Sequence, residues 1–439
     1  MVRDLRDYIA LLEEEKWLDH VTEETELLKV PTIMKAQEKK EQTVIFENIV
    51  DSRDGTHFKY RLINNLFANR DRIAKLFGCR REDVSKVFAE RYESYIDPVM
   101  VEDGPCHEVI EKGDDIDILK FPFIQHNAHD VGRYITAGMV VAKDPETGIR
   151  NLSFHRMQLK GKNKTGFRMT PYQDMEAYYK KACAMGKPLE VAVCIGNNPL
   201  DLLAAACGPA RDIDELRIAG SLRQEPVQLV KCLTVDLEVP AGTELVLEGY
   251  ILPEEREAEG PFGDFMEFSI PVMDNPVLHI TCVTHRKDPI VQAIGAGSKD
   301  DGTLLGTPRE AQIYNALKAI NIDVEAICLN VVNNYLTGAV AIHKHIEDEP
   351  TNAILAAFGT FRFLKNFIVV DHDVDVFDPQ DIFWAMTTRL RAERGVMVIP
   401  HAVGFGRDVH GIHTAKLGID ATAPLNCWDE FARVQPPAY

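Results

Sequence analysis

Two acidic residues in a glycine-rich stretch are the strongest candidates for chemistry in this sequence. Glu259 and Asp264 are separated by Gly-Pro-Phe-Gly within EREAEGPFGDFMEF. Gly260, Pro261 and Gly263 disfavour a helix and favour a tight loop, so the two carboxylates can converge on one pocket. Paired carboxylates can raise the pKa of one member until it serves as a general acid near neutral pH. The alternative is a solvated acidic turn after a strand.

Three further residues are weaker candidates. Asn151 and Arg156 lie in NLSFHR, on a predicted strand that begins after a DPETG turn. Five positions apart, they face opposite sides of a regular strand, so a shared site needs a bulge or a ligand that lies over the strand. Arg156 is otherwise an ordinary salt-bridge donor. Glu215 enters a glycine-containing turn, where a surface role is the default.

Other motifs are uninformative. The sequence has no Walker A loop, no Gly-x-Gly-x-x-Gly and no Gly-x-Ser-x-Gly, and we interpret GAGSKDDG and GFGRDVHG as turns. Histidine pairs occur without the cysteine or carboxylate partners of a zinc motif, at His126/His129, His343/His345 and His410/His413. We expect structural or surface roles for the first and last pairs. The middle pair follows a predicted strand and is open between a surface and a binding role.

The elements that position these residues predict a mixed α/β and β fold. Residues 1–110 start with a helical pattern and a strand, 111–285 contain successive β segments, and 286–425 alternate strands and helices, which favours a largely parallel sheet. Residues 426–439 form a tail. We therefore predict an N-terminal α/β region, a β-rich domain and a C-terminal α/β domain.

Composition excludes several classes of function. Lys and Arg number 49 against 68 Asp and Glu, a net charge of −19, which disfavours a nucleic-acid or anionic-membrane surface. We see no apolar run of about 18 residues and no signal peptide, so we expect a cytoplasmic protein. The nine cysteines are scattered, which predicts reduced thiols rather than a disulfide framework.

Taken together, these segments resemble the UbiD family of decarboxylases, which use prenylated FMN. The likeness covers most of the chain in the same order and rests on NLSFHR at 151–156, GNNPLDLLAAA at 196–206, ELRIAG at 215–220, VKCLTVDLEVPA at 230–241, ELVLEGY at 244–250, EGPFGD at 259–264, VVDHDVDVFDPQDIFWAMTTR at 369–389 and GIDAT at 418–422. The resemblance implies that the β-rich domain is split-barrel-like and binds the flavin.

The resemblance also implies roles for individual residues. Arg156, Glu259 and Asp264 form the catalytic network, with Asp264 as proton donor, and Asn151 and Glu215 bind a divalent metal, usually manganese, with potassium as a further candidate ion. The cofactor-contacting stretches correspond to Asn151, Phe154, His155, Arg156, Arg168, Met169, Thr170, Gln173 and Glu215. Some family members have a histidine as a further metal ligand where this chain has Tyr172, Gln173 and Asp174. Gln173 or Asp174 is a candidate replacement.

The implied reaction is the reversible non-oxidative decarboxylation of a small aromatic acid, for which we expect a hydroxybenzoate type. Losing CO2 from an sp2 carbon leaves an electron pair that no side chain can delocalise, so an electron sink is required. His343, Lys344 or His345 could bind a phenolic oxygen. The alternatives are a polyprenylated hydroxybenzoate, a heteroaromatic or alkenyl acid, or a flavin-binding assembly protein without turnover. A flavin prenyltransferase as cofactor supplier and a homo-oligomer, dimer or hexamer, are the expected partners.

Overall fold

The computed structural model describes residues 2–171, 173–332, 334–406, 411 and 413–434. The chain forms two compact units, which we call the first unit (Met1–Asn69 with Arg91–Asp301) and the second unit (Arg70–Glu90 with Gly302–Tyr439). Part of the N-terminal region thus belongs to the second unit. The domain boundaries near residues 110, 285 and 425 stay predictions.

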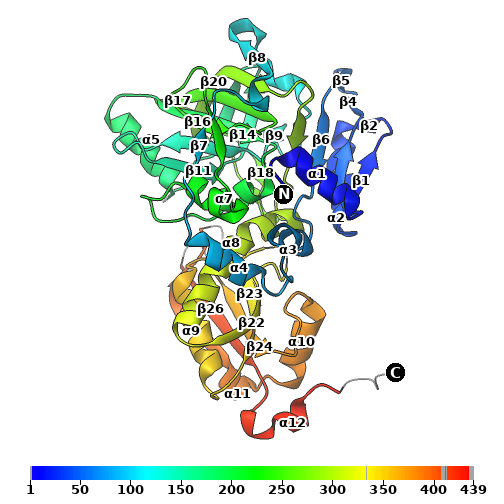
Figure 1. Ribbon diagram of the computed structural model, residues 1–439, viewed down its shortest axis with the longest axis vertical. Coiled ribbons are helices and arrows are strands. Elements are labelled where there is room, and N and C mark those ends of the chain that lie inside the picture. Colours follow the sequence, from blue (N-terminus) through cyan, green and yellow to red (C-terminus); the bar gives the residue numbers. More distant parts are fainter. Residues whose placement is uncertain (1, 172, 333, 407–410, 412, 435–439) are drawn as a thin grey trace. The chain divides into compact units, whose positions relative to one another are not determined.

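The first unit is built on a curled antiparallel sheet (Figure 1). Its strand order is β11-β10-β14-β17-β20-β13-β12-β9, and β8 also pairs with β20. The strands span Val109–Lys112 (β8), Tyr134–Ile135 (β9), Met139–Lys143 (β10), Arg150–Phe154 (β11), Met157–Gly161 (β12), Lys164–Phe167 (β13), Leu189–Ile195 (β14), Leu245–Glu259 (β17) and Met273–His285 (β20). In this sheet, β11 carries Asn151 and Phe154, and β17 ends at Glu259.

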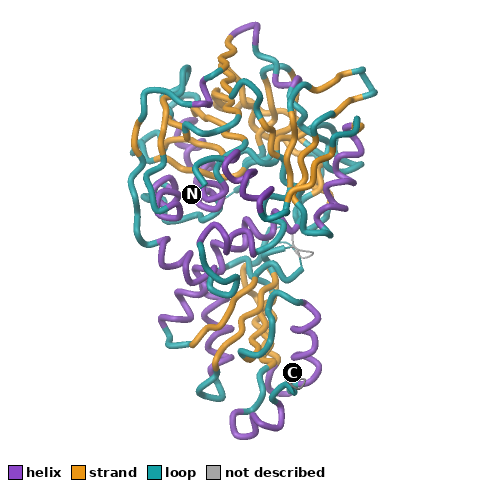
Figure 2. The backbone as a smooth tube through the Cα atoms, turned by 45° about the vertical axis from the view of Figure 1, so that its right-hand side comes forward, coloured by secondary structure: helices purple, strands orange, loops and turns teal. Residues whose placement is uncertain are grey.

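A helix packs on this sheet because its apolar residues follow the helical period. In α5 (Asp174–Ala184) the buried residues are Met175, Tyr178, Tyr179 and Ala182, at positions i, i+3, i+4 and i+7. They join one core with apolar residues of β14 and β17. Figure 1 shows α1 (Leu5–Glu14), α2 (Val30–Glu38) and α7 (Glu215–Arg223) beside the sheets of this unit, and Figure 2 shows its helices and strands in separate colours. The unit also contains α6 (Pro199–Ala205).

Within the described residues, four smaller sheets accompany the large sheet of the first unit. They are β1-β3-β6-β21 (Leu18–Val21, Thr43–Phe46, Arg61–Asn64, Ile290–Gln292), β2-β4-β5 (Thr25–Glu26, Ile49–Asp51, Thr56–Phe58), β16-β15-β7 (Glu238–Pro240, Gln228–Lys231, Val99–Met100) and β18-β19 (Phe262–Gly263, Ser269–Ile270). Short 3-10 turns along the chain occupy Leu27–Lys29, Pro105–His107, Gly113–Asp115, Ile118–Lys120 and Leu425–Cys427.

The second unit contains a five-stranded sheet of order β22-β23-β24-β26-β25. Its elements are α3 (Asp71–Phe77), α4 (Val84–Tyr92), α8 (Lys299–Ala319, which begins in the first unit), β22 (Asp323–Cys328), β23 (Thr337–His343), α9 (Glu349–Thr360), β24 (Asn366–Asp371), α10 (Pro379–Thr388), α11 (Ala392–Gly395), β25 (Val396–Val403), β26 (His413–Ala421) and α12 (Trp428–Phe431). In the described part of the chain, no helix combines the length and apolar character needed to cross a membrane.

The sheet of the second unit is mixed, and the expectation of a largely parallel sheet was wrong at its edges. β23-β24 and β24-β26 are parallel, whereas β22-β23 and β25-β26 are antiparallel. β22 and β23 are separated by residues 329–336, which is too short for the crossover of about a dozen residues that a parallel pair needs. The predicted mixed α/β and β fold class is confirmed.

Candidate active site

The predicted acidic loop connects the two longest strands of the first unit. β17 ends at Glu259 and β20 begins at Met273, and these two residues are register partners. Between them, β18 and β19 form a smaller hairpin in which Phe262 pairs with Ile270. Glu259 therefore lies at the rim of the large sheet, and Asp264 lies in the turn of the smaller hairpin.

Arg156 and Glu259 form a buried, bidentate ion pair. Arg156 Nε donates to Glu259 Oε1 at 3.1 Å, and Nη2 donates to Oε2 at 3.0 Å. The Glu259 side chain is 0% exposed, and Asn275 Nδ2 donates a third hydrogen bond, 2.9 Å, to its Oε2. A buried carboxylate is stable only when donors compensate its charge. The three hydrogen bonds to Glu259 do this, and they fix the Arg156 and Glu259 side chains at the sheet rim.

Aromatic rings pack around this ion pair. The Arg156 guanidinium lies 4.6 Å from the centroid of the Phe262 ring, and the Tyr134 ring lies 4.6 Å from the same ring. Burial and the nearby Glu259 carboxylate raise the pKa of the Tyr134 phenol. The rings exclude water from one side of the guanidinium and strengthen its electrostatic contacts.

The Asp264 carboxyl is held by its own turn. Asp264 is 7% exposed, and its Oδ1 accepts hydrogen bonds from the backbone N–H groups of Met266 (3.0 Å) and Phe268 (3.1 Å). A short polar side chain that bonds backbone N–H groups ahead of it is typical of an Asx turn. These two bonds fix the orientation of the carboxyl.

A second segment fastens the hairpin from outside. Asp130 accepts from the N–H of Gly263 at 2.8 Å and from the N–H of Asn127 at 2.7 Å, and Val131 N–H donates to Pro261 O at 3.1 Å. Burial raises the pKa of Asp130. A Cβ at position 263 would overlap the Asn127 amide, so glycine is required there by close packing.

A chain of hydrogen bonds runs from β11 toward Arg168. Asn151 Nδ2 donates to Ser153 Oγ at 2.9 Å, and Ser153 Oγ lies 3.0 Å from His155 Nε2. His155 Nδ1 lies 3.0 Å from Arg168 O, which can only accept, so Nδ1 carries the proton and Nε2 accepts from Ser153. Burial lowers the pKa of His155 to about 4, which keeps the ring neutral.

Glu215 is a buried carboxylate beside the same strand. It is 2% exposed, and its Oε2 accepts from Leu152 N–H of β11 at 2.8 Å. Burial raises its pKa to about 8, and among the described residues no Lys or Arg forms an ion pair with it. A buried carboxylate without a basic partner is suited to bind a cation, because the cation would stabilise the ionised form of Glu215.

The other residues predicted to contact a cofactor differ in exposure. Met169 is buried, Phe154 and Thr170 are half-buried, and Gln173 is exposed at the start of α5. The half-buried Arg168 Nη1 lies 3.2 Å from Met273 Sδ and 3.5 Å from Asn275 Oδ1.

The segment that stands where some relatives have a histidine is only partly described. Asp174 forms an ion pair with Arg211 at 2.6 Å, and Tyr172 lies outside the described residues. Within the described residues, no group of three His, Cys, Asp or Glu side chains is arranged to hold a metal ion. Asn151 would contribute an amide oxygen rather than one of these groups, so metal binding by Asn151 and Glu215 stays a prediction.

Family profiles match nearly the whole chain in three consecutive stretches. They are described as the N-terminal domain (residues 9–92), the Rift-related domain (98–299) and the C-terminal domain (302–421) of UbiD, the 3-octaprenyl-4-hydroxybenzoate carboxy-lyase. The protein belongs to the UbiD family. It is a UbiD-class decarboxylase, as the resemblance in its motifs implied.

Relatives of this UbiD protein act on different acids. Anhydromevalonate phosphate decarboxylase of Methanosarcina mazei is 33% identical over 98% of this chain and 99% of its own length. Gallate decarboxylase of Lactiplantibacillus plantarum is 31% identical, over 85% and 84% of the two chains. The UbiD-class enzyme HmfF from Pelotomaculum thermopropionicum, solved with FMN, has a TM-score of 0.93 at 34% identity over 99% of this chain and 97% of that chain. An evolved dimeric form of HmfF was solved with prenylated FMN, with a TM-score of 0.89.

The histidine pairs of this UbiD chain have diverse surroundings. His126 is buried, its Nε2 lies 3.3 Å from Thr136 Oγ1, and burial lowers its pKa to about 4, while His129 is exposed. In the second unit, His343 Nε2 lies 3.0 Å from Glu325 Oε2 and its ring stacks on His372 at 4.4 Å. His410 lies outside the described residues, and His345 and His413 are exposed.

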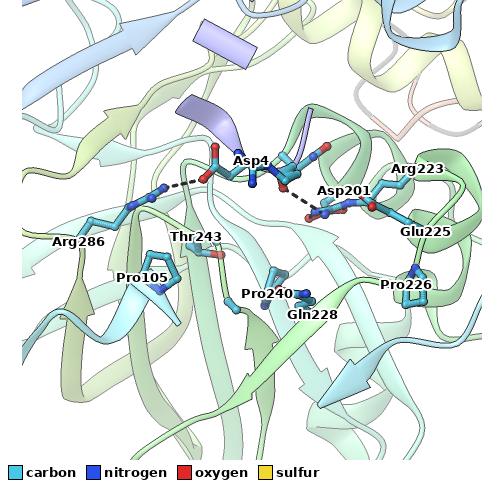
Figure 3. A pocket seen from close by; sticks show the side chains of 14 residues that line it. Asp4, Pro105, Asp201, Arg223, Glu225, Pro226, Gln228, Pro240, Thr243 and Arg286 are labelled. Atoms are coloured by element: carbon cyan, nitrogen blue, oxygen red, sulfur yellow. Dashed lines mark hydrogen bonds and ion pairs between the residues drawn. The ribbon is translucent and has the colours of Figure 1, made fainter. Parts of the chain in front are cut away.

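A cavity of about 380 Å³ in the first unit lies away from the predicted site (Figure 3). Its walls include Arg286 and Arg223, which are paired with carboxylates: Arg286 Nη1 with Asp4 at 3.0 Å, and Arg223 Nε with Asp201 at 2.7 Å. None of the predicted catalytic, cofactor or metal residues lines it. Its guanidinium charges are already compensated, so it does not resemble an anion site.

Sequence reasoning missed several residues around the UbiD site. Asn275 shares Glu259 with Arg156, Tyr134 packs on Phe262, and Asp130 fastens the hairpin. Asn275 carried a weak signal, because it lies near the start of a strand long enough to pair with the one that ends at Glu259. Asp130 directly follows the His126/His129 pair, whose spacing suggests metal ligation rather than a carboxylate that fastens a hairpin.

Proposed function

We propose that this UbiD decarboxylase catalyses the reversible, non-oxidative loss of CO2 from a small unsaturated acid, with prenylated FMN bound in the first unit. The proposal is carried by the buried network of Arg156, Glu259 and Asn275, next to a turn that fixes Asp264. Prenylated FMN, when bound, supplies the electron sink for the pair of electrons that CO2 leaves behind. The HmfF structures with FMN and prenylated FMN support this choice.

The side chains of the network have distinct tasks in this proposal. Arg156 uses Nε and Nη2 on Glu259, which leaves Nη1 to bind the substrate carboxylate. Asp264 donates the proton that replaces CO2 on the substrate carbon. Phe262 and Tyr134 keep water away from the guanidinium, so its contact with the substrate is strong.

The cofactor is held in this proposal by residues around β11. Asn151 and Glu215 would hold a divalent metal, for which manganese is our candidate, and the metal would supply positive charge for the flavin phosphate. The buried Glu215 without a basic partner among the described residues supports this role. Potassium is a further candidate ion. The flavin contacts come from Phe154, His155, Arg156, Arg168, Met169, Thr170 and Gln173.

Two substrate classes are candidates. Of the three residues expected to bind a phenolic oxygen (His343, Lys344 or His345), Lys344 is engaged elsewhere. Its Nζ bonds Thr422 Oγ1 and Glu347 Oε2, both at 3.0 Å, and its side chain is 3% exposed. The near full-length relative that acts on anhydromevalonate phosphate favours a phosphorylated alkenyl acid. The gallate decarboxylase relative keeps a hydroxybenzoate-type acid as the second candidate.

The central experiment tests cofactor and proton donor together. Protein co-produced with a flavin prenyltransferase should carry the mass of prenylated FMN and release CO2 from its substrate. Asp264→Asn should keep the flavin and lose turnover by at least roughly 100-fold, the lower range for general acid catalysis. Asp274→Asn is the matched control, since this exposed carboxylate lies on β20 of the same hairpin. Full activity without a modified flavin, or in Asp264→Asn, would refute the proposal.

A comparison of acids resolves the substrate class. CO2 release from anhydromevalonate phosphate, gallate and 3,4-dihydroxybenzoate should be measured on the same loaded preparation. Preference for the phosphorylated acid would establish the first candidate, and preference for a phenolic acid the second. Polyprenylated and heteroaromatic acids belong in the panel as the remaining alternatives.

We also propose that the protein is a homo-oligomer. The evolved dimeric form of HmfF is similar to this protein over nearly the whole chain, which supports a dimer. A hexamer is the larger alternative. Light scattering of the purified protein measures the mass against 49.4 kDa for one chain.

A further inference from the structure

One loop of the first unit is bonded to the acidic hairpin at two positions. We call this loop, residues 125–134, the clamp segment. Val131 N–H donates to Pro261 O at 3.1 Å. Asp130 Oδ1 accepts from Gly263 N–H at 2.8 Å. Because the proposed proton donor is the next residue of the chain, the clamp segment fixes the backbone that carries it.

The clamp segment is itself attached to its surroundings. Gln125 Nε2 donates to Asp130 O at 3.1 Å, which closes the loop on itself. His126 Nε2 lies 3.3 Å from Thr136 Oγ1, and the same oxygen accepts from Ile294 N–H at 3.1 Å. A loop that is held in this way can hold the hairpin in place.

The Asp130 carboxylate joins the two segments. Asp130 is 5% exposed, and its second oxygen, Oδ2, accepts from Asn127 N–H of the clamp segment at 2.7 Å. One oxygen thus binds the loop and the other binds the hairpin, at distances typical of charge-assisted hydrogen bonds. An amide has a single acceptor oxygen, so it cannot bind both N–H groups. Burial of this carboxylate raises its pKa, so its charge costs folding free energy, which favours a role beyond stability.

The aromatic contacts of the hairpin depend on the same attachment. Phe262 lies between the two bonded residues, and its ring is 4.6 Å from the Arg156 guanidinium. Two rings of the clamp segment pack on Phe262: Tyr134 at 4.6 Å and His126 at 6.1 Å between centroids. The clamp segment therefore sets the position of the hairpin relative to the guanidinium that we propose binds the substrate carboxylate.

We propose that Asp130 is a positioning residue for the reaction: by bonding Gly263 N–H, it holds the Asp264 carboxyl where its proton reaches the substrate carbon. The inference rests on the proposed function, in which Asp264 is the donor. Asp130 acts in this role through the hairpin backbone. A displacement of about 1 Å can lower a rate by roughly 100-fold, so a loosened clamp should be visible in turnover.

The first test is turnover of Asp130→Asn, co-produced with a flavin prenyltransferase and assayed with the acid that the native enzyme prefers. We expect kcat to fall by roughly 10- to 100-fold, because one N–H group loses its acceptor. Flavin content and KM should change little, since Arg156 stays bonded to Glu259. Asp51→Asn is the matched control and should keep a native kcat. Asp51 is 4% exposed and accepts from Arg53 N–H at 3.1 Å, beside the β4–β5 pair of the same unit.

Amide hydrogen exchange gives a readout that needs no flavin. In unloaded Asp130→Asn, the peptide that covers residues 260–268 should exchange roughly 10-fold faster than in the native protein, because a hydrogen bond to a charged group is lost. The peptide that covers β14 should exchange at the native rate.

A steric variant tests the same contact from the hairpin side. A Cβ at Gly263 would lie 2.4 Å from Asn127 Nδ2, so Gly263→Ala should push the hairpin away from the clamp segment and lower kcat. Asn127→Ala removes the overlapping amide. The double variant should therefore recover most of the lost turnover, which a role of either side chain alone does not predict.

The outcomes separate the two proposals. A native kcat in Asp130→Asn beside an inactive Asp264→Asn would overturn the positioning role and leave the donor in place. Unchanged exchange of residues 260–268, or equal losses in Gly263→Ala and the double variant, would also overturn the positioning role. Normal turnover by Asp264→Asn would instead overturn the proposed function.

Discussion

Arg156→Met should reveal how strongly the first unit depends on the ion pair at the sheet rim. The variant leaves the fully buried Glu259 carboxylate without its guanidinium. Removing one partner of a buried pair costs about 3–5 kcal/mol, and losing the cation–π contact with Phe262 adds about 0.5–2 kcal/mol. We therefore expect the free energy of unfolding of this unit to fall by roughly 3–5 kcal/mol or more.

The double variant Arg156→Met with Glu259→Gln removes the ion pair without leaving a buried charge. It therefore separates the stability lost with the ion pair from the cost of an uncompensated carboxylate. The introduced glutamine would keep a carbonyl oxygen for the Asn275 amide, so the double variant should recover at least about 2 kcal/mol of the loss. Denaturant unfolding of the unloaded proteins at neutral pH measures both effects. Arg3→Met is the control, because Arg3 is 78% exposed and solvent screens its pair with Asp7.

Two results would refute this reasoning. A loss below about 1 kcal/mol in Arg156→Met would mean that water or another group compensates Glu259. A double variant as unstable as the sum of the single variants would mean that the two side chains contribute independently.

Two further predictions concern carboxylates in the first unit. Glu215→Ala should lower retention of manganese and flavin by roughly tenfold or more while the unloaded protein stays folded, as measured by metal analysis and flavin absorbance; unchanged retention would remove Glu215 from the metal site. Asp301→Asn should stabilise the protein at pH 8 but not at pH 4, as measured by thermal unfolding. The pKa of Asp301 is about 6 in the folded protein against about 3.9 unfolded, so its ionisation costs roughly 2–3 kcal/mol above pH 6, and that cost disappears as pH falls to 4. Equal effects of the substitution at both pH values would contradict this.

Local patterns were sufficient to predict the fold class and the acidic hairpin. The runs at β14 and β24 are mostly apolar, and the glycines around Pro261 interrupt a long strand pattern. These signals are local, because strand period and turn chemistry depend on neighbours in sequence. The predicted direction of the edge strands in the second unit was wrong, because the side-chain period of a strand does not determine which strand it pairs with.

The position of Asn275 shows what local patterns leave out. Asn275 pairs in register with Glu257, two residues before Glu259 on the same strand, so the two side chains are diagonal neighbours on one face. Predicting this requires the register of β17 with β20, and that register includes irregular positions between Ile251 and Arg256. Arg156 posed a similar difficulty: β11 ends at Phe154, so strand alternation from Asn151 does not extend to it.

The two carboxylates of the acidic hairpin are held in ways that suit different tasks. Glu259 receives a guanidinium and an amide, which compensate a full negative charge at a fixed place. Asp264 receives two neutral backbone N–H groups on one oxygen. Neighbouring carboxyls with contrasting environments are how proteins assign acid and charge-holding roles to the same chemical group.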